Sequence, residues 1–241
     1  MEEQTLEQTS TNSKGSSSLS IRGVLEVFYK PMDFFKELKD NPKILVPYVV
    51  FILIVFVSLF LLSELIVEMQ VNSPQFLRQM EASGQVVTPE FKEIMKMNTL
   101  IFGTLAMALY PLLVAAFALF FGNFVFAGKG SFKKLLSVAL YGGILFSLAG
   151  MIVIPMMLSK GSMMVSFSLA VLVTDFGIES IIYTALSKIS IFHIWEIIVV
   201  GIGFATIYDF PRNKGYMLAV LSVGLISIIH IGMAALGSMI G

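Results

Sequence analysis

Residues 44–63 read ILVPYVVFILIVFVSLFLLS, a run without a single charged side chain. A helix that crosses the hydrocarbon core of a bilayer needs about 20 mainly apolar residues, so this run is long enough to span a membrane. Four later stretches meet the same condition, namely residues 99–121, 135–158, 189–207 and 216–239. The sequence therefore predicts an all-α fold, a polytopic membrane helix bundle with five transmembrane helices.

The composition of the 241-residue chain agrees with a membrane location and excludes a soluble enzyme. Hydrophobic residues make up 56% of the chain and charged residues 13%, whereas an average soluble domain has roughly 45–50% and about 25%. The 16 basic residues balance the 16 acidic ones, which gives no indication of a nucleic-acid partner. Because the chain has no cysteine, thiolate nucleophiles and Cys-ligated metals are excluded. We expect the lipid bilayer as a partner, and no enzymatic activity, cofactor or bound metal.

One further apolar stretch leaves the number of spans open. Residues 163–173 have only about half the length of a span, and Asp175 and Glu179 follow them. Beyond these carboxylates, apolar residues recur at helical spacing from Ile178 onward, as in an amphipathic helix. We interpret residues 160–188 as partly re-entrant or lying in the membrane interface; the alternative is a sixth span.

The distribution of Lys and Arg predicts the orientation, because cytoplasmic loops of membrane proteins are enriched in both residues. With five spans, eleven of the sixteen basic residues lie on the side of the N-terminus, and five lie on the other side. The richer side includes Lys129, Lys133 and Lys134 of the second loop and Arg212 and Lys214 of the fourth. We therefore expect a cytoplasmic N-terminus and an external C-terminus, in the cell inner (cytoplasmic) membrane.

The chain divides into three segments of different character. Residues 1–20 are rich in Ser, Thr, Gln and Glu, which predicts a disordered polar tail. Residues 21–43 place apolar residues, Phe35 among them, between charged ones, which predicts amphipathic juxtamembrane helices lying in the headgroup layer. Residues 44–241 form the membrane domain, in which residues 64–98 are predicted to be an external helical hairpin.

Two stretches contain motifs of a known family. The first is VFYKPMDFFKELKDNPKILVP (residues 27–47), which contains Pro31, Phe35 and Pro42. The second is AGKGSFKKLLSVALYGGILFSL (residues 127–148), a short basic loop that leads into the third predicted span. Both stretches resemble the Yip family, the multi-spanning membrane proteins named for their interaction with Ypt/Rab GTPases, and Pro31, Phe35 and Pro42 have the family's spacing.

A third stretch carries the same resemblance. It is ISIFHIWEIIVVGIGFATIYDFPRNKGY (residues 189–216), in which Phe192, Trp195 and Gly201 match the family's F-x-x-W run and later glycine. We expect Trp195 to pack within the bundle, with an interfacial anchor as the alternative. Together the three stretches cover about residues 22–238.

The resemblance implies five spanning helices with a cytoplasmic N-terminus. Eukaryotic members look like membrane-trafficking factors and carry a D-L-Y-G-P-type motif that is not found in this sequence, so Rab binding is not carried over. The closer resemblance is to the prokaryotic branch of the family. It implies the fold and a role as a membrane-embedded accessory.

Three ionisable residues lie within the predicted spans, where such residues are costly and usually face the bundle interior. His193 and Glu196 are three residues apart and share a helix face, and Glu196 and His230 lie at depths that agree to within about one turn. We therefore predict an intramembrane polar cluster of these three residues. It could be a hydrogen-bonded group that fixes helix packing, a site that handles protons or a substrate, or a metal site. The metal reading lacks a convincing fourth ligand.

Small residues recur on two of the predicted spans. Gly143, Ser147 and Gly150 form a stripe on the third span, and Gly201 and Ala205 form another on the fourth. Close helix packing in lipid relies on such residues, which predicts two helix-packing seams.

Three functions from different classes remain open. The first is a non-enzymatic accessory protein that assists another membrane complex, such as an exporter or envelope-stress system. The second is a small transporter or channel that uses Glu196 and His230, and the third is a membrane-organising or lipid and vesicle trafficking factor.

We interpret Lys129, Lys133 and Lys134 as basic residues that follow the positive-inside rule. The alternative is that they form a docking surface for a cytoplasmic partner. A polar cavity that reaches Glu196 favours the transporter, and a filled core favours the accessory protein. The sequence leaves the oligomeric state undetermined.

Overall fold

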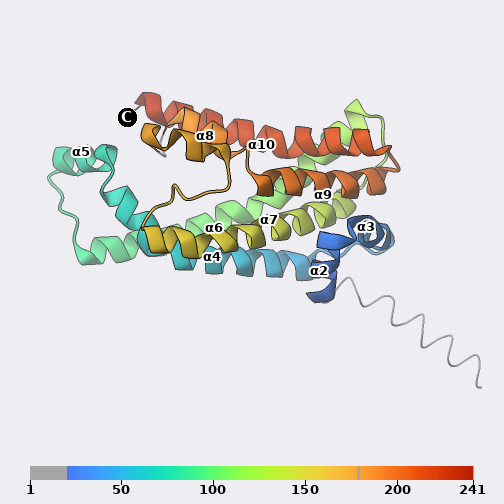
Figure 1. The fold of residues 1–241 in the computed structure, drawn as a ribbon, viewed down its shortest axis with the longest axis horizontal. Helices are drawn as coiled ribbons and strands as arrows, with labels where there is room; N and C mark the ends of the chain where they lie inside the picture. The colour runs from blue at the N-terminus through green and yellow to red at the C-terminus, as the bar shows by residue number, and fades with distance from the viewer. Residues whose placement is uncertain (1–20, 178–179, 241) are drawn as a thin grey trace, which may run out of the picture. The chain divides into compact units, whose positions relative to one another are not determined.

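The computed structural model describes residues 21–177 and 180–240, and this part of the chain is all-α, as predicted (Figure 1). The polar tail predicted for residues 1–20 and Ile178 of the predicted amphipathic repeat lie outside the described residues. The elements are α2 (Ile21–Tyr29), α3 (Pro31–Asp40), α4 (Leu45–Val71), α5 (Pro74–Ser83), α6 (Pro89–Phe120), the π-helix η2 (Phe121–Val125), α7 (Phe132–Lys160), the 3-10 helix η3 (Leu169–Phe176), α8 (Ile181–Ser187), α9 (Ile191–Tyr208) and α10 (Arg212–Ile240).

Five helices in the described part of the chain are long and apolar enough to cross a membrane. These candidate spans are Leu45–Val71, Pro89–Val125, Phe132–Lys160, Ile191–Tyr208 and Arg212–Met233. Each overlaps one predicted span, so the prediction of five candidate spans is confirmed. Four of the five helices also extend beyond the apolar runs that predicted them, because a helix that has already formed continues through polar residues at little further cost.

The chain divides into two compact units, and each of the five long helices contributes residues to both. Unit 1 consists of Met1–Phe51, Pro111–Leu145 and Glu196–Gly224, and unit 2 consists of Ile52–Tyr110, Phe146–Trp195 and Leu225–Gly241.

Unit 1 has a closely filled core. Every residue of α7 from 135 to 145 is buried. The largest side chains that are less than 2% exposed come from α2, α3, α4, α7, α9 and α10, and they include Phe35, Phe51, Tyr141, Phe204 and Leu218. Ser137 is also fully buried, and its hydroxyl donates to the backbone oxygen of Lys43 at 2.9 Å, which ties the start of α4 to α7.

In unit 2, the region predicted as an external helical hairpin is built mainly from the ends of two spanning helices. Helix α4 continues past Glu64 to Val71, α6 begins at Pro89, and the short helix α5 lies between them in the chain. Ser73 caps α5 by accepting a hydrogen bond from the Phe76 amide at 3.3 Å, and Gly84 ends it in the left-handed conformation.

The segment between α7 and α9 contains no long helix among its described residues. It holds η3 and α8, both shorter than half a membrane span. An isolated antiparallel bridge joins Ser168 to Ser190, and the Leu169 amide donates to the Ile189 oxygen at 3.0 Å. The described residues therefore give no support to a sixth span.

Candidate functional site

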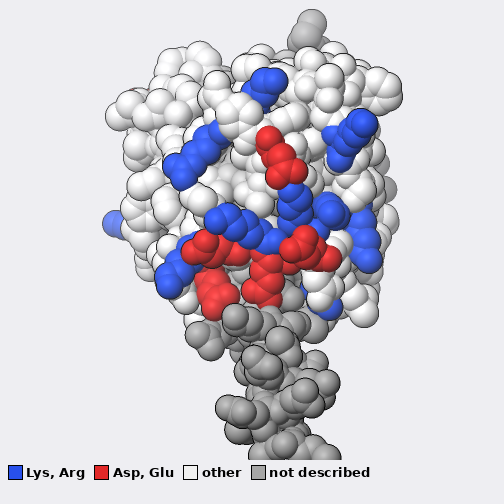
Figure 2. Space-filling model, turned by 90° about the vertical axis from the view of Figure 1, so that its right-hand side faces the viewer, with Lys and Arg blue, Asp and Glu red and all other residues white. Residues whose placement is uncertain are grey.

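The basic residues of the chain are divided between the two units. Those of unit 1 with described side chains are Lys30, Lys36, Lys39, Lys43, Lys129, Lys133, Lys134, Arg212 and Lys214, and those of unit 2 are Arg78, Lys92, Lys96, Lys160 and Lys188. This division coincides with the one that the sequence predicts for the two sides of the membrane. Figure 2 shows one face on which charged side chains gather; it is the right-hand side of Figure 1, where α2 and α3 lie.

Helix α3 is held on unit 1 by its apolar side. Phe34 packs edge-on against Tyr141 of α7, with 4.6 Å between ring centroids, and the Phe35 ring lies against Gly203 of α9. Phe35 and Leu38 are 0% exposed. The expectation that these apolar residues lie in the lipid headgroup layer is therefore wrong for Phe35 and Leu38, because protein helices cover them. Lys36 lies on the opposite side of α3, and Lys39 lies at the edge of the apolar side.

The connection from α6 to α7 encloses the ring of Tyr208, the last residue of α9. A side chain at Gly122, Gly128 or Gly130 would overlap this ring, so the contact requires glycine at all three positions. The Tyr208 hydroxyl donates to the backbone oxygen of Ala118 at 3.2 Å. These contacts fix the end of α9 against the connection.

Asn123 closes the same connection. Its side-chain oxygen accepts from the Gly130 amide at 2.9 Å, and its side-chain nitrogen donates to the Gly130 oxygen at 3.3 Å. One amide side chain therefore satisfies both backbone groups of a residue seven positions later.

The residue after Tyr208 has an unusual backbone. Asp209 has a φ of 55°, a left-handed conformation that is uncommon outside glycine and is more often adopted by Asp and Asn than by other residues. Its carboxylate is paired with Lys39 of α3, with 2.5 Å between Oδ1 and Nζ. The next residue, Phe210, stacks on Tyr208 with 4.8 Å between ring centroids and 7° between the ring planes. The turn between α9 and α10 is thus fixed on both sides.

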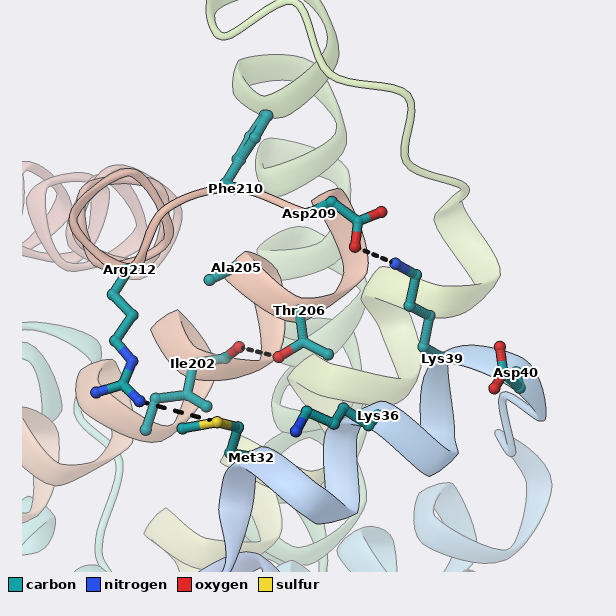
Figure 3. Close-up of a pocket in the computed structure, with 10 residues that line it drawn as sticks. All are labelled: Met32, Lys36, Lys39, Asp40, Ile202, Ala205, Thr206, Asp209, Phe210 and Arg212. Carbon is teal, nitrogen blue, oxygen red and sulfur yellow. Dashed lines mark hydrogen bonds and ion pairs between the residues drawn. The ribbon is translucent and has the colours of Figure 1, made fainter.

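A cavity of about 570 Å³ lies between α3, the end of α9 and the start of α10 (Figure 3). Its charged lining residues are Lys36, Lys39, Asp40, Asp209 and Arg212, and its other lining residues are Met32, Ile202, Ala205, Thr206 and Phe210. The cavity thus combines basic, acidic and apolar groups at the ends of two candidate spans.

We define the basic loop as Lys129, Lys133 and Lys134, which lie in and just after the connection from α6 to α7. Among the described residues, no carboxylate forms an ion pair with any of the three. In unit 2, by contrast, Lys92 pairs with Glu68 of α4 at 2.6 Å, and Lys96 pairs with Glu64 and Glu93. Within the part of the chain that the structure describes, the positive charge of the basic loop is therefore not compensated by an ion pair.

The three residues of the predicted polar cluster are distributed over both units. Glu196 belongs to unit 1, where it is 1% exposed. His193 and His230 belong to unit 2 and have different partners there: His193 Nδ1 lies 2.8 Å from the Ser190 hydroxyl, and His230 Nδ1 lies 3.2 Å from Lys188 Nζ. Burial lowers the pKa of Lys188. The cluster of all three residues stays a prediction.

His193 also lines a second cavity, of about 440 Å³, which lies within unit 2. Most of its lining residues are apolar, and Phe146 contacts the His193 ring with 4.4 Å between centroids. Ser147 and Gly150 of the predicted seam line this cavity.

The predicted small-residue seams differ in what they contact. A Cβ at Gly201 would come within 3.0 Å of the Tyr216 Cα, and Gly215 of α10 lies against Ala205. Gly143 faces the Phe51 ring in the same unit. At Gly150, no atom of a neighbouring element lies within 4 Å of the position of a Cβ, because this part of α7 borders the cavity. The predicted helix-packing seam therefore does not extend to Gly150.

The residues of the predicted family motifs lie at helix starts, in a connection between helices and in aromatic contacts. Pro31 is the first residue of α3, where a missing amide hydrogen is tolerated, and Pro42 lies between α3 and α4. Phe192 contacts Phe167 edge-on, with 5.7 Å between centroids. Trp195 is 41% exposed, which contradicts its expected packing within the bundle; the interfacial anchor stays a prediction.

Sequence reasoning missed Tyr208, Asp209 and the glycines that surround the Tyr208 ring. The one available signal was the density of glycine in residues 122–130, which is unusual in a connection next to spanning helices. Within the described residues, no group of three His, Cys, Asp or Glu side chains could hold a metal ion.

Comparison with known proteins assigns the family. The Yip1 domain matches residues 25–235, nearly the whole chain. No curated protein and no solved structure gives a significant match. With its five candidate spans, this chain is a multi-pass membrane protein that belongs to the Yip1 domain family, a family of non-enzymatic membrane proteins.

Proposed function

We propose that this protein is an accessory protein of the cell inner membrane that assists another membrane complex, such as an exporter or an envelope-stress system. The basic loop of unit 1 would dock that partner on the cytoplasmic side. The observation that carries the proposal is that Lys129, Lys133 and Lys134 form no ion pair within the described residues, in contrast to Lys92 and Lys96 of unit 2. Lysines without counter-charges on the protein are available to acidic groups of a partner.

The core of unit 1 supports the accessory role over transport. Glu196 is 1% exposed, and it lines neither of the two described cavities. A residue that handles protons or a substrate needs a path for them, and the side chains around Glu196 are closely packed. The Val200 side chain occupies the space next to Gly142, and Glu196 itself lies 3.8 Å from the position of a Cβ there.

The third alternative is a membrane-organising or lipid and vesicle trafficking factor, and membrane trafficking is what members of the family do. Bilayer reshaping by the amphipathic helices of this chain has less support. An amphipathic helix that reshapes a bilayer inserts its apolar side into the lipid. In α3 this side is covered by protein at Phe35 and Leu38. The exposed apolar residues of α2, Leu25 and Tyr29, form a smaller surface.

The proposal is tested by purification in mild detergent with quantitative identification of co-purifying membrane proteins. The docking variant replaces Lys129 and Lys133 by Gln. The control variant replaces Lys30 and Lys43 by Gln, which removes the same charge from unit 1 outside both the basic loop and the cavity. We expect the docking variant to lose at least one reproducible partner that the control retains.

A third variant, Glu196→Gln, separates the accessory role from transport. The amide keeps the shape of the side chain but cannot titrate, so it abolishes proton handling. We expect the Glu196→Gln variant to keep the co-purifying partner and to leave the activity of that partner unchanged. If the partner's activity were lost with the Glu196→Gln variant and fully kept with the docking variant, the result would contradict the proposal and favour the transporter.

A further inference from the structure

The cavity beside α3 contains two cations that lack a strong partner in the described part of the chain. Lys39 is neutralised by Asp209 at 2.5 Å. Lys36 has only the exposed Asp33, one turn away in α3, at 3.6 Å. The Arg212 guanidinium contacts the Met32 sulfur at 3.8 Å, which is a weak acceptor.

Lys36 and Arg212 line the same cavity from different elements. Lys36 comes from α3 and Arg212 from the first residue of α10. Figure 3 shows both side chains extending toward Met32, while Lys39 extends away from them to Asp209. An anion bound near Met32 would therefore meet an ammonium and a guanidinium together. Arginine suits a phosphate group, because its planar fork donates two parallel hydrogen bonds.

The position of the cavity along the helices restricts the kind of anion. It lies where the candidate span of α9 ends at Tyr208 and that of α10 begins at Arg212. In a bilayer, the ends of spanning helices lie at the level of the polar headgroups. The cavity also has apolar lining at Ile202, Ala205 and Phe210, which a free inorganic ion would not use.

We propose that this cavity binds the headgroup of an anionic phospholipid. Arg212 and Lys36 contact the phosphodiester oxygens, and the apolar lining contacts the glycerol end of the lipid. Basic pockets at the ends of spanning helices bind anionic headgroups in this way. Asp40 and Asp209 also line the cavity, so its net charge is small, which matches a lipid with a single negative charge better than a polyphosphate. This inference does not depend on the docking function, because it concerns other residues and a different ligand.

The test measures lipid retention by the purified full-length protein. The protein is exchanged into detergent with equal amounts of phosphatidylglycerol and phosphatidylcholine, and the bound lipids are counted by native mass spectrometry. The cavity variant replaces Lys36 and Arg212 by Gln, and the matched control is again the Lys30→Gln, Lys43→Gln pair. We expect the wild type to retain phosphatidylglycerol preferentially. The cavity variant should lose at least about tenfold of this preference, whereas the control should keep it within about twofold.

Two further measurements make the result decisive. Arg212→Lys keeps the charge but loses the two-pronged geometry, so its preference should lie between those of the wild type and the cavity variant. Equal thermal midpoints of all variants, expected because the changed side chains lie at the surface, exclude unfolding as the cause. Equal losses in the cavity variant and the control, or no lipid preference in the wild type, would overturn the proposal. Complete displacement of the lipid by millimolar inorganic phosphate would overturn the assignment to a lipid.

Discussion

Helix α7 passes through two environments that differ sharply in packing. In unit 1, every residue from 135 to 145 is buried. In unit 2, residues 146–160 of the same helix have only three buried members, Ala149, Val153 and Ile154, and several of the others line a cavity of about 440 Å³. All the largest side chains that are less than 2% exposed belong to unit 1.

Apolar composition alone therefore does not decide how a spanning helix packs. Both parts of α7 are mainly apolar, but in unit 1 small residues, such as Gly142 and Gly203, allow neighbouring side chains to approach closely. In unit 2, Gly150 faces open space instead. The connections in unit 1 are also fixed by long-range contacts, and this rigid framework positions the charged cavity and the basic loop.

The largest difference between the two units is expected in their accessibility to a reagent added outside the cell, because the sequence predicts that their basic residues lie on opposite sides of the membrane. The chain has no cysteine, so single cysteines can be introduced at the exposed positions Ser131 and Asn213 of unit 1 and Gln85 of unit 2. An impermeant thiol reagent added to intact cells should label only Gln85→Cys, because the positive-inside rule places the richer basic side in the cytoplasm. Labelling at Asn213 without labelling at Ser131 would contradict the five-span topology.

A large difference in stability is expected between two leucines of α7. Leu140 is 0% exposed and Leu158 is 44% exposed. Leu140→Ala should lower the free energy of unfolding by about 2–5 kcal/mol, because it leaves a void in a filled core. Leu158→Ala should change it by less than about 0.5 kcal/mol. Thermal unfolding in detergent measures both, and similar losses for the two variants would remove the distinction between the units.

Replacement of two glycines by alanine should change the free energy of unfolding in opposite directions. At Gly201, the added Cβ comes within 3.0 Å of the Tyr216 backbone, which cannot move aside as a side chain can. We expect Gly201→Ala to destabilise the protein by about 1–3 kcal/mol. Gly150→Ala meets no atom within 4 Å and removes backbone freedom from the unfolded chain, so it should stabilise by about 0.5–1 kcal/mol. A destabilised Gly150→Ala variant would mean that a partner or lipid fills that space.

The smallest predicted effect compares two asparagines. Asn123 makes two hydrogen bonds to Gly130, and Asn123→Ala should cost about 1–2 kcal/mol because it leaves both backbone groups unsatisfied. Asn72, which follows α4, donates one exposed hydrogen bond to the backbone oxygen of Glu68 near the end of that helix, and Asn72→Ala should change the unfolding free energy by less than about 0.5 kcal/mol. The same thermal unfolding assay resolves the pair, and an equal response would show that the connection in unit 1 is no better fixed than a helix end in unit 2.

The sequence was sufficient for the spans and insufficient for the site, for physical reasons. The spans follow from the length and apolarity of continuous runs, which are local properties that a bilayer imposes. Whether Phe35 faces lipid or protein depends instead on Gly203, which lies far away in the chain, and the same amphipathic pattern fits both cases. The sequence shows the glycines in residues 122–130 but not that they surround the Tyr208 ring, because only the fold brings these residues to the end of α9.

The ion pair between Lys39 and Asp209 joins residues 170 positions apart, and this separation has a consequence for biogenesis. A ribosome releases α3 early, whereas the end of α9 follows only after three spans have been inserted. Until then, Phe35 lacks the contact with Gly203 of α9, and its ring is open to chaperones or to the bilayer. A helix that is synthesised early thus completes its contacts late, so α3 should be more accessible to protease in ribosome-bound chains truncated before residue 191 than in the full-length protein.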